Sequence, residues 1–228
     1  MKEDVLEQVV DDYLKFTGYF TAHNVRFKPR KDHPDYKADA DRVPSDVDVV
    51  GIKPHPRGND VIVVTCKSWQ SGFNARQKLL ELREERGPKK RPTWHHFREL
   101  WKPKWSEAFL DEIERLTGQR HFSYRIAVTH FSGEDPAKWT EEWANDPTIA
   151  TNLPGCSIGF LPLRDMWSPL LSELTKTPAA SQIGRLVQLL KAAGLTAPVE
   201  VAEPSGPVPG SDAAIAAELE EEGIWEDN

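Results

Sequence analysis

The sequence has few of the features that mark well-known classes of protein. Its two cysteines, Cys66 and Cys156, lie 90 residues apart in apolar surroundings, a spacing that predicts reduced core thiols and no disulfide or zinc framework. No apolar run approaches the roughly 20 residues that cross a bilayer, and the acidic, amphipathic start at residues 1–16 is unlike a signal peptide. Rossmann and P-loop glycine patterns are missing, so nothing indicates a nucleotide-cofactor enzyme. These absences favour a cytoplasmic globular protein.

Positive charge is also scarce overall. The net charge is −7, but the last 26 residues contain eight acids without a Lys or Arg, and residues 1–202 hold 29 basic against 28 acidic side chains. Within this nearly neutral part, residues 83–104 carry eight Lys or Arg against three Glu. Such a segment is compatible with nucleic-acid binding, and equally with a solvated helix face. Trp94, Phe97 and Trp101 recur there at helical spacing, which predicts the buried stripe of a helix.

Patterns of apolar residues divide the chain into helices and strands. Val and Ile runs at residues 46–53 and 60–67 mark two strands, and the short connection between them is rich in Pro and Gly. An antiparallel hairpin is therefore predicted. Helices are expected at residues 3–17, 73–85, 105–117, 135–145, 164–176 and 179–193. Further strands are expected at residues 19–30, 122–131 and 156–163.

The alternation of helices and strands indicates a mixed α/β domain, and we expect it to span residues 1–177. Because the central strands are nearly continuous Val and Ile, helices are expected to cover both faces of the sheet. A C-terminal helix at 178–195 would pack on the core or on a second copy of the chain, as in a homodimer. The Pro, Gly and Ser linker and the acidic tail at 196–228 are predicted to be flexible.

Charged side chains gather at the ends of the two central strands. Since side chains alternate along a strand, Asp46 and Asp48 share one face of the first strand, and Thr65 and Lys67 share one face of the second. Neighbouring strands lie about 5 Å apart, so the acidic end of one can lie beside the lysine of the other. Lysines often end strands simply to reach water. However, an ammonium that ends the run VIVVTC would be costly to bury alone, which predicts a nearby carboxylate or bound anion.

An acid on the first helix, an Asp on one strand and a Lys that closes the next strand form an ordered set. Over roughly residues 3–80, this set resembles the PD-(D/E)XK nuclease superfamily. Glu7 in LEQVVDDYLKFTGYF matches the helix acid of that family, Asp48 in VPSDVDVVGI matches the strand Asp, and Lys67 in VIVVTCKSWQ matches the lysine. Asp46 is a close competitor of Asp48 for the strand position.

The sequence departs from the family pattern at one place. The residue two before Lys67 should be Glu or Asp, and it is Thr65. A Gln often follows the lysine in the family, and either Gln70 or Gln77 could take that role.

The departure leaves three interpretations, because hard cations such as Mg²⁺ prefer carboxylate oxygens and water. Glu7, Asp48, the backbone carbonyl of Cys66 and water could suffice for one metal ion. A carboxylate of the following helix, Glu81 or Glu84, could take the missing place. Alternatively, the site no longer cuts, and the fold serves as a module that binds nucleic acid or a protein.

The resemblance implies a restriction-endonuclease-like fold, with a mixed central sheet flanked by helices, and hydrolysis of phosphodiester bonds with Mg²⁺ or Mn²⁺. It implies that Asp48 and Glu7 hold the metal, that Lys67 orients water or stabilises the transition state, and that Gln70 completes the catalytic set. DNA is the expected substrate ahead of RNA, cut as by an endonuclease or an exonuclease. The cations expected to contact nucleic acid are Lys89, Lys90, Arg91, Arg98, Lys102 and Lys104.

Overall fold

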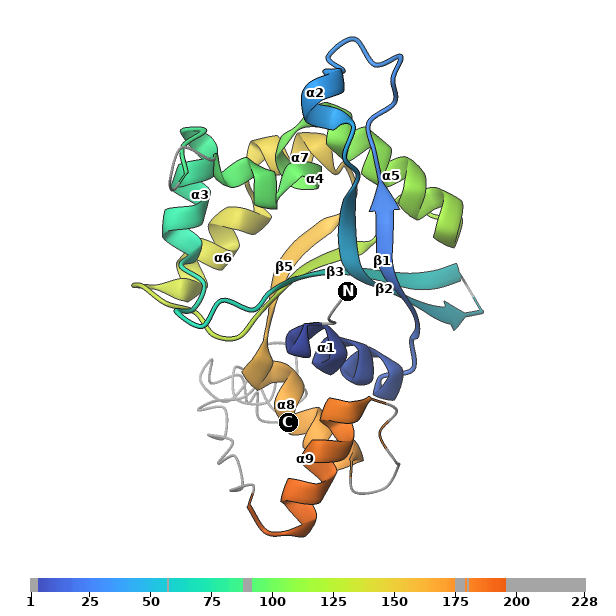
Figure 1. The fold of residues 1–228 in the computed structure, drawn as a ribbon, viewed down its shortest axis with the longest axis vertical. Helices are drawn as coiled ribbons and strands as arrows, with labels where there is room; N and C mark the ends of the chain where they lie inside the picture. Colours follow the sequence, from blue (N-terminus) through green and yellow to red (C-terminus); the bar gives the residue numbers. More distant parts are fainter. Residues whose placement is uncertain (1–3, 57, 88–91, 175–178, 180, 196–228) are drawn as a thin grey trace, which may run out of the picture. The chain divides into compact units, whose positions relative to one another are not determined.

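The computed structural model describes residues 4–56, 58–87, 92–174, 179 and 181–195, and the chain there is built on one five-stranded sheet (Figure 1). Its strands lie side by side in the order in which they occur along the chain. They are β1 (Phe20–Phe27), β2 (Ser45–His55), β3 (Gly58–Lys67), β4 (Ser123–Val128) and β5 (Ser157–Pro162). The first three pair antiparallel, whereas β3, β4 and β5 pair parallel. The sheet is therefore mixed, and β3 is the strand at which its direction changes.

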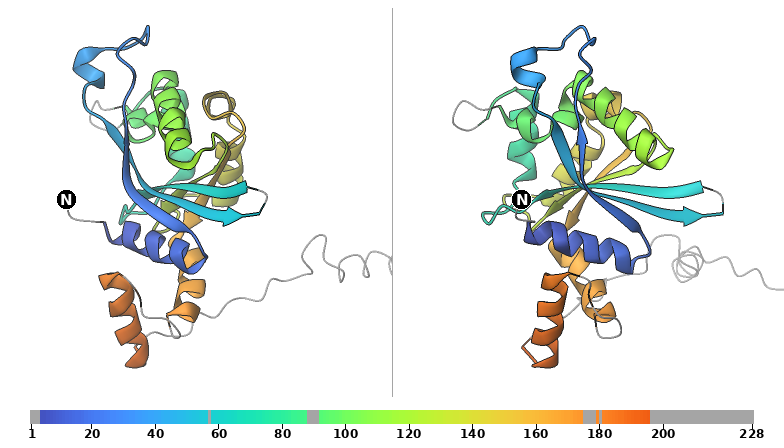
Figure 2. Two further views of the ribbon diagram at one scale, coloured as in Figure 1. Left: turned by 90° about the vertical axis from the view of Figure 1, so that its right-hand side faces the viewer. Right: turned by 45° about the vertical axis from the view of Figure 1, so that its right-hand side comes forward.

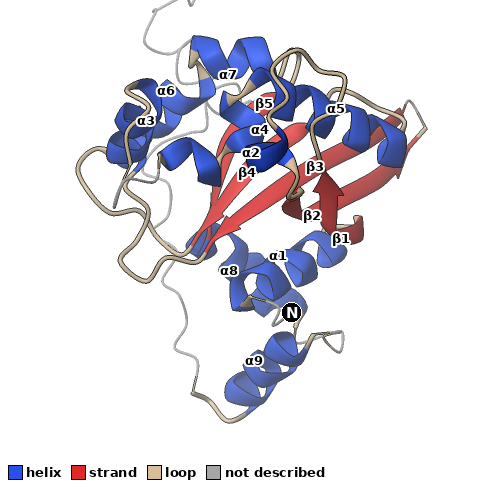
Figure 3. Cartoon of the chain, turned by 45° about the horizontal axis from the view of Figure 1, so that its top comes forward, coloured by secondary structure: helices blue, strands red, loops and turns tan. Residues whose placement is uncertain are grey.

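The helices of the described residues fall into two groups, one on each side of the sheet (Figures 1 and 3). One group is α3 (Ala75–Arg83), a 3₁₀ helix (Thr93–His96), α4 (Arg98–Trp101), α5 (Pro103–Thr117), α6 (Pro136–Ala144) and α7 (Pro147–Asn152). The other group is α1 (Val5–Phe16), α8 (Leu163–Glu173) and α9 (Gln182–Ala192). A short helix, α2 (Ala38–Asp41), lies in the connection between β1 and β2.

An apolar core lies on each side of the sheet, between the sheet and the helices that cover it. On one side, Val63 of β3 packs with Phe109 of α5 and Trp143 of α6, and all three side chains are fully buried. On the other side, Val64, the next residue of β3, packs with Val10 of α1 and Met166 of α8. Neighbouring residues of one strand point to opposite faces, so β3 supplies both cores. The prediction of a mixed α/β domain with both faces of the sheet covered is confirmed.

The predicted hairpin is also confirmed. Strands β2 and β3 pair from His55↔Gly58 at the turn to Val49↔Val64 at the other end. At the turn the hairpin extends beyond the ladder that joins β1 to β2, which stops at Phe20↔Ile52 (Figure 2). Past Val49 and Val64, β2 separates from β3, while β3 continues along β4 as far as Lys67↔Val128. The two strands therefore part at the residues that the sequence singled out.

The segment that contains Trp94, Phe97 and Trp101 differs from the single helix expected. Phe97 and Trp101 are buried, as the stripe predicted. However, Phe97 has a φ of −143°, so that it ends the 3₁₀ helix before α4 begins. The interruption turns the chain, and it brings Glu99 of α4 into the core, where it is only 5% exposed.

The chain divides into two compact units at residue 193, and α9 belongs to the first of them. Within that unit α9 packs against α1: Val187 joins the core of α1, and the Ser181 hydroxyl donates a hydrogen bond to Asp12. The predicted linker and tail at 196–228 lie outside the described residues. In the part of the chain that is described, none of the helices combines the length and the apolar character that crossing a bilayer requires.

Candidate active site

Asp48 occupies the point at which β2 leaves β3. Beyond Val49↔Val64 the backbone N–H of Cys66 has no partner strand on the β2 side, and a buried N–H without an acceptor is costly. The Asp48 carboxylate takes over, and its Oδ2 accepts a hydrogen bond from Cys66 N at 2.5 Å. The Thr65 hydroxyl donates to the same oxygen at 3.2 Å. Among the described residues Oδ1 accepts no hydrogen bond, so that one carboxylate oxygen is left for a ligand.

Thr65 and Lys67 lie on the same face of β3, as the strand period predicts. The Lys67 ammonium donates to Thr65 Oγ1 at 2.9 Å, and its nitrogen lies 5.4 Å from the centre of the Phe97 ring. Thr65, which is 4% exposed, thus accepts from Lys67 and donates to Asp48. Thr65 therefore links Lys67 to Asp48 through hydrogen bonds.

A second acidic side chain, that of Glu99 in α4, lies close enough to Lys67 for their charges to interact. Glu99 of α4 is buried, and the Tyr124 hydroxyl of β4 donates a hydrogen bond to its Oε1. Burial raises the pKa of Glu99, whereas the bond from Tyr124 and the charge of Lys67 lower it. The Lys67 charge also lowers the pKa of Asp48, although burial dominates there and the net direction is upward. Lys67 is half-buried, and it lies close enough to Asp48 and Glu99 for its charge to act against the rise in the pKa of both.

Glu99 is the residue that the sequence did not reveal. Glu99 is one of the three acids in the basic segment at 83–104, and charge alone predicts that it lies on a solvated helix face. Its neighbours Phe97, Leu100 and Trp101 are apolar and buried, and this pattern could have indicated a buried carboxylate that needs a partner.

The first turn of α1 brings further acids to the same place. Asp4 caps the helix, since its Oδ1 accepts from Leu6 N at 2.8 Å. Its other oxygen accepts a hydrogen bond from the hydroxyl of Ser68, the residue directly after Lys67. This bond fixes the start of α1 at the end of β3, and it places Glu7, one turn further on, next to Asp48.

Glu7 shows the consequence of crowding these carboxylates. Burial and, after it, the negative charges of Asp48, Asp4 and Asp46 together raise the pKa of Glu7 to about 7. Burial likewise raises the pKa of Asp48, and the charge of Asp46 adds to the shift. Acids that repel each other in a partly buried position form the kind of site that a bound cation would stabilise.

We expect this crowding to appear in the pH dependence of stability. The folded pKa of Glu7, about 7, lies above the ordinary value of 4.5, so the folded state holds the proton more tightly. Protonated Glu7 contributes its whole share of the free energy of unfolding below pH 4.5. This contribution is lost as the pH rises through about 7. Relative to Glu7→Gln, the wild type should therefore lose free energy of unfolding between pH 4.5 and 7 in urea titrations.

The matched control for this measurement is Glu141→Gln, which changes an exposed Glu of α6. The difference between wild type and Glu141→Gln should stay constant over the same range of pH. Parallel curves for the wild type and Glu7→Gln would show that Glu7 is not crowded in solution.

The donor set fits one hard divalent cation in charge and chemistry. Within the described part of the chain, no three His, Cys, Asp or Glu side chains converge into a group that could hold a metal. Mg²⁺, however, is often bound through one or two carboxylates, with water and substrate phosphate in its other positions. Glu7 and Asp48 supply two such carboxylates, one of them with a free oxygen.

The other residues considered as ligands lie in different surroundings. Asp46 is exposed on β2, near enough to Glu7 and Asp48 to raise the pKa of both. Cys66 meets Asp48 through its N–H and not through its carbonyl, and burial raises the pKa of its thiol.

The acids proposed to replace the missing ligand are used elsewhere. Glu81 accepts hydrogen bonds from Gln77 at 2.7 Å, Lys78 at 2.8 Å and Thr93 at 2.5 Å. Glu84 forms an ion pair with Arg86 at 2.5 Å. None of these contacts reaches Asp48 or Lys67.

The two glutamines considered for the catalytic set lie after β3. Gln70 is exposed in the turn that follows the strand, and Gln77 is exposed on α3 with its amide on Glu81. The structure brings neither of them into contact with Lys67 among the interactions of the described residues.

Three of the six cations predicted to contact nucleic acid are described, and each has a partner within the protein. Lys104 is largely buried and pairs with Asp41 at 2.6 Å, and Lys102 pairs with Glu85 at 2.7 Å. Arg98 lies 4.8 Å from the centre of the Trp105 ring. The others, Lys89, Lys90 and Arg91, lie outside the described residues.

Comparison with known proteins gives no relative. No family model matches the chain, and no curated protein or solved structure does. What the site can do therefore has to be argued from its own residues.

Proposed function

We propose that this protein is a metal-dependent nuclease with a restriction-endonuclease-like fold of the PD-(D/E)XK type, acting on DNA. The observation that carries the proposal is the placement of Glu7 and Asp48 near each other and near Lys67, where burial raises the pKa of both carboxyl groups and the charge of Asp48 adds to the rise for Glu7. Repelling carboxylates next to a cationic side chain are a common arrangement for handling phosphate with a divalent ion.

Glu7 and Asp48 would hold Mg²⁺ or Mn²⁺. When bound, the ion would offset the repulsion between the two carboxylates and polarise an oxygen of the scissile phosphate. The family position filled by Thr65 gives the site one acidic ligand fewer, so the ion should bind weakly.

Lys67 would act on the phosphate directly. Its ammonium can donate a hydrogen bond to a non-bridging oxygen, and it can stabilise the negative charge that grows there in the transition state. Thr65 positions this ammonium through its hydroxyl at 2.9 Å. The buried side chain of Glu99 lies near Lys67, and the charge of Lys67 acts against the rise that burial causes in the pKa of Glu99.

A second function is favoured by a specific observation. Asp48, Thr65 and Lys67 are already joined to one another by hydrogen bonds of 3.2 and 2.9 Å. Side chains held by such direct contacts fit a nuclease fold that binds nucleic acid or a protein partner without cutting it. This alternative predicts binding under all conditions and cleavage under none.

The two functions are separated by an assay of metal dependence. The proposed nuclease should cut plasmid or single-stranded DNA in millimolar Mg²⁺, or faster in Mn²⁺, because it has few acidic ligands. EDTA should abolish the cutting. Cleavage that continues unchanged in EDTA would contradict the metal-dependent mechanism. DNA binding with steep salt dependence and no cleavage in either metal would favour the alternative.

A further inference from the structure

A pocket of about 390 Å³ lies between β1 and α5, outside the candidate active site. Its apolar wall includes Phe27 of β1 and Ala108 of α5. Charged side chains line the rest of it, four of them cations and two of them acids. The cations are Arg26, Lys28, Arg30 and Arg115, and the acids are Asp111 and Glu112.

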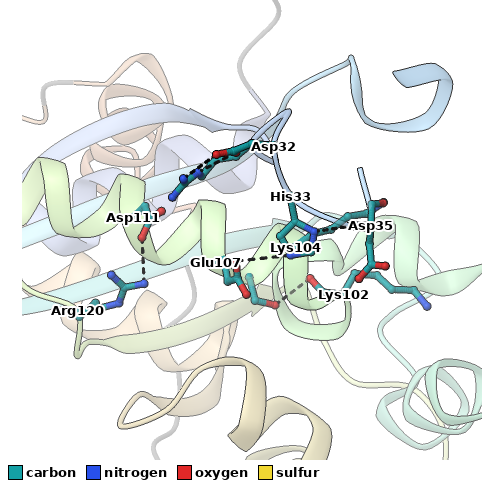
Figure 4. A network of polar contacts seen from close by, with 10 residues as sticks. Asp32, His33, Asp35, Lys102, Lys104, Glu107, Asp111 and Arg120 are labelled. Atoms are coloured by element: carbon teal, nitrogen blue, oxygen red, sulfur yellow. Dashed lines mark hydrogen bonds and ion pairs between the residues drawn. The ribbon is translucent and has the colours of Figure 1, made fainter. Parts of the chain in front are cut away.

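The two acids of this pocket are already neutralised. Glu112 forms an ion pair with Arg115 at 2.6 Å. Asp111 pairs with Arg120 at 3.0 Å, and Figure 4 shows this contact on the face of α5. A ligand with negative charge would therefore not meet uncompensated carboxylates from α5.

Two of the cations have no ion pair among the described residues. Arg30 pairs with Asp32 at 3.0 Å. Arg26 and Lys28, in contrast, form no ion pair with any described residue, and both are exposed. They lie near the end of β1 and directly after it, two residues apart, so their Cα atoms are separated by about 7 Å. The lining of the pocket thus includes two cations without an ion pair, and the nearest acid across the ladder from Arg26 is Asp46.

The position of Arg26 connects this pocket to the candidate active site. In the antiparallel ladder Arg26 lies opposite Asp46, and Asp46 precedes Asp48 by two residues on the same strand. Arg26 is therefore about one strand spacing and two residues of strand from the proposed metal ligand. A polyanion that crosses the site could continue over β1 into the pocket.

We infer that the pocket between β1 and α5 binds the sugar–phosphate backbone of DNA, with Arg26 and Lys28 contacting phosphates. The inference rests on the proposed function for the nature of the polymer. It replaces the basic segment at 83–104 as the main contact surface among the described residues, because Lys102 and Lys104 of that segment are paired internally.

The test measures binding of a fluorescein-labelled single-stranded 20-mer by fluorescence anisotropy, using the full-length chain in EDTA, where no cutting occurs. Arg26→Ala with Lys28→Ala should raise Kd by roughly 10- to 30-fold at 150 mM salt and lower the slope of log K against log salt by about 2. The control variant, Arg76→Ala with Lys138→Ala, removes the same charge from exposed positions on α3 and α6 and should bind as wild type does.

Each outcome bears on the inference separately from the proposed function. Equal Kd values for the wild type and the Arg26 and Lys28 variant would overturn it, and so would equal weakening in both double variants, since the effect would then be general charge. If the Arg26 and Lys28 variant alone loses binding, the inference stands even where no metal supports cutting. Cleavage that depends on Asp48, with unchanged DNA binding by this variant, would sink the inference and leave the nuclease.

Discussion

Asp48→Asn should reduce DNA cleavage by at least about 100-fold while the protein stays folded. An asparagine oxygen can still accept from the Cys66 N–H and the Thr65 hydroxyl, so the junction of β2 and β3 keeps its hydrogen bonds. What the substitution removes is the negative charge that would attract the metal. Initial rates of plasmid cleavage at saturating Mn²⁺ measure the loss, and circular dichroism checks the fold.

Asp46→Asn is the matched control for this prediction. It removes the same charge two residues earlier on β2, from an exposed side chain. We expect a much smaller reduction in rate, together with a lower pKa of Glu7, because one repelling charge has gone. The reverse result, with Asp46→Asn inactive and Asp48→Asn active, would assign the metal to Asp46. Equal activity of both variants and the wild type would contradict the mechanism altogether.

Trp143→Ala should cost the protein about 3–5 kcal/mol of stability. Trp143 is fully buried, its Nε1 donates to the carbonyl of Ala75 at 2.9 Å, and its ring packs against Phe73, Phe97 and Phe160. Truncation leaves a large cavity and removes the hydrogen bond that joins α6 to the first residue of α3. The change in the free energy of unfolding in urea measures the cost.

Trp139→Ala provides the comparison within the same helix. Trp139 is half-buried, and its ring contacts the cations Arg76 and Lys138. Its loss should be clearly smaller, since solvent can fill the space that the ring leaves. Similar losses for the two variants would mean that α6 is not anchored through Trp143.

The loss of Trp143 should also reach the candidate site. Phe97, which contacts the Trp143 ring, carries the Lys67 ammonium over its face. Trp143 therefore packs against the ring of Phe97, and Phe97 in turn contacts Lys67.

Local pattern was enough to predict the elements that build the site. The Val and Ile runs of β2 and β3 and the turn between them allowed the hairpin to be predicted, because alternation and turn chemistry are local properties. The placement of Asp48 and Lys67 at the ends of paired strands followed from the same alternation. The apolar stripe of α1 likewise placed Glu7 on a helix in front of the sheet.

Contacts between distant segments could not be predicted in this way. Glu99 reaches the Tyr124 hydroxyl because the backbone of Phe97 interrupts a helix, and no local spacing indicates that turn. Lys104 is predicted to contact nucleic acid, but Asp41, the last residue of α2 and 63 residues earlier in the chain, holds it in a largely buried ion pair. Arg26 and Lys28 were overlooked because two cations on one strand do not raise the local charge noticeably.

The change of direction at β3 has a consequence for the order of folding. Strands β2 and β3 join through a tight turn, and β1 joins β2 through residues 28–44, so the contacts of these strands form between residues that are closer in the chain than those of β3 and β4. The parallel ladder of β3 and β4 requires residues 68–122 to fold back first, which carries a larger entropy of loop closure and slows the step. Asp48 and Lys67 belong to the early hairpin, whereas Tyr124 and Glu99 arrive with the crossover. Lys67 would thus come near the buried side chain of Glu99 only after the late, non-local step of folding.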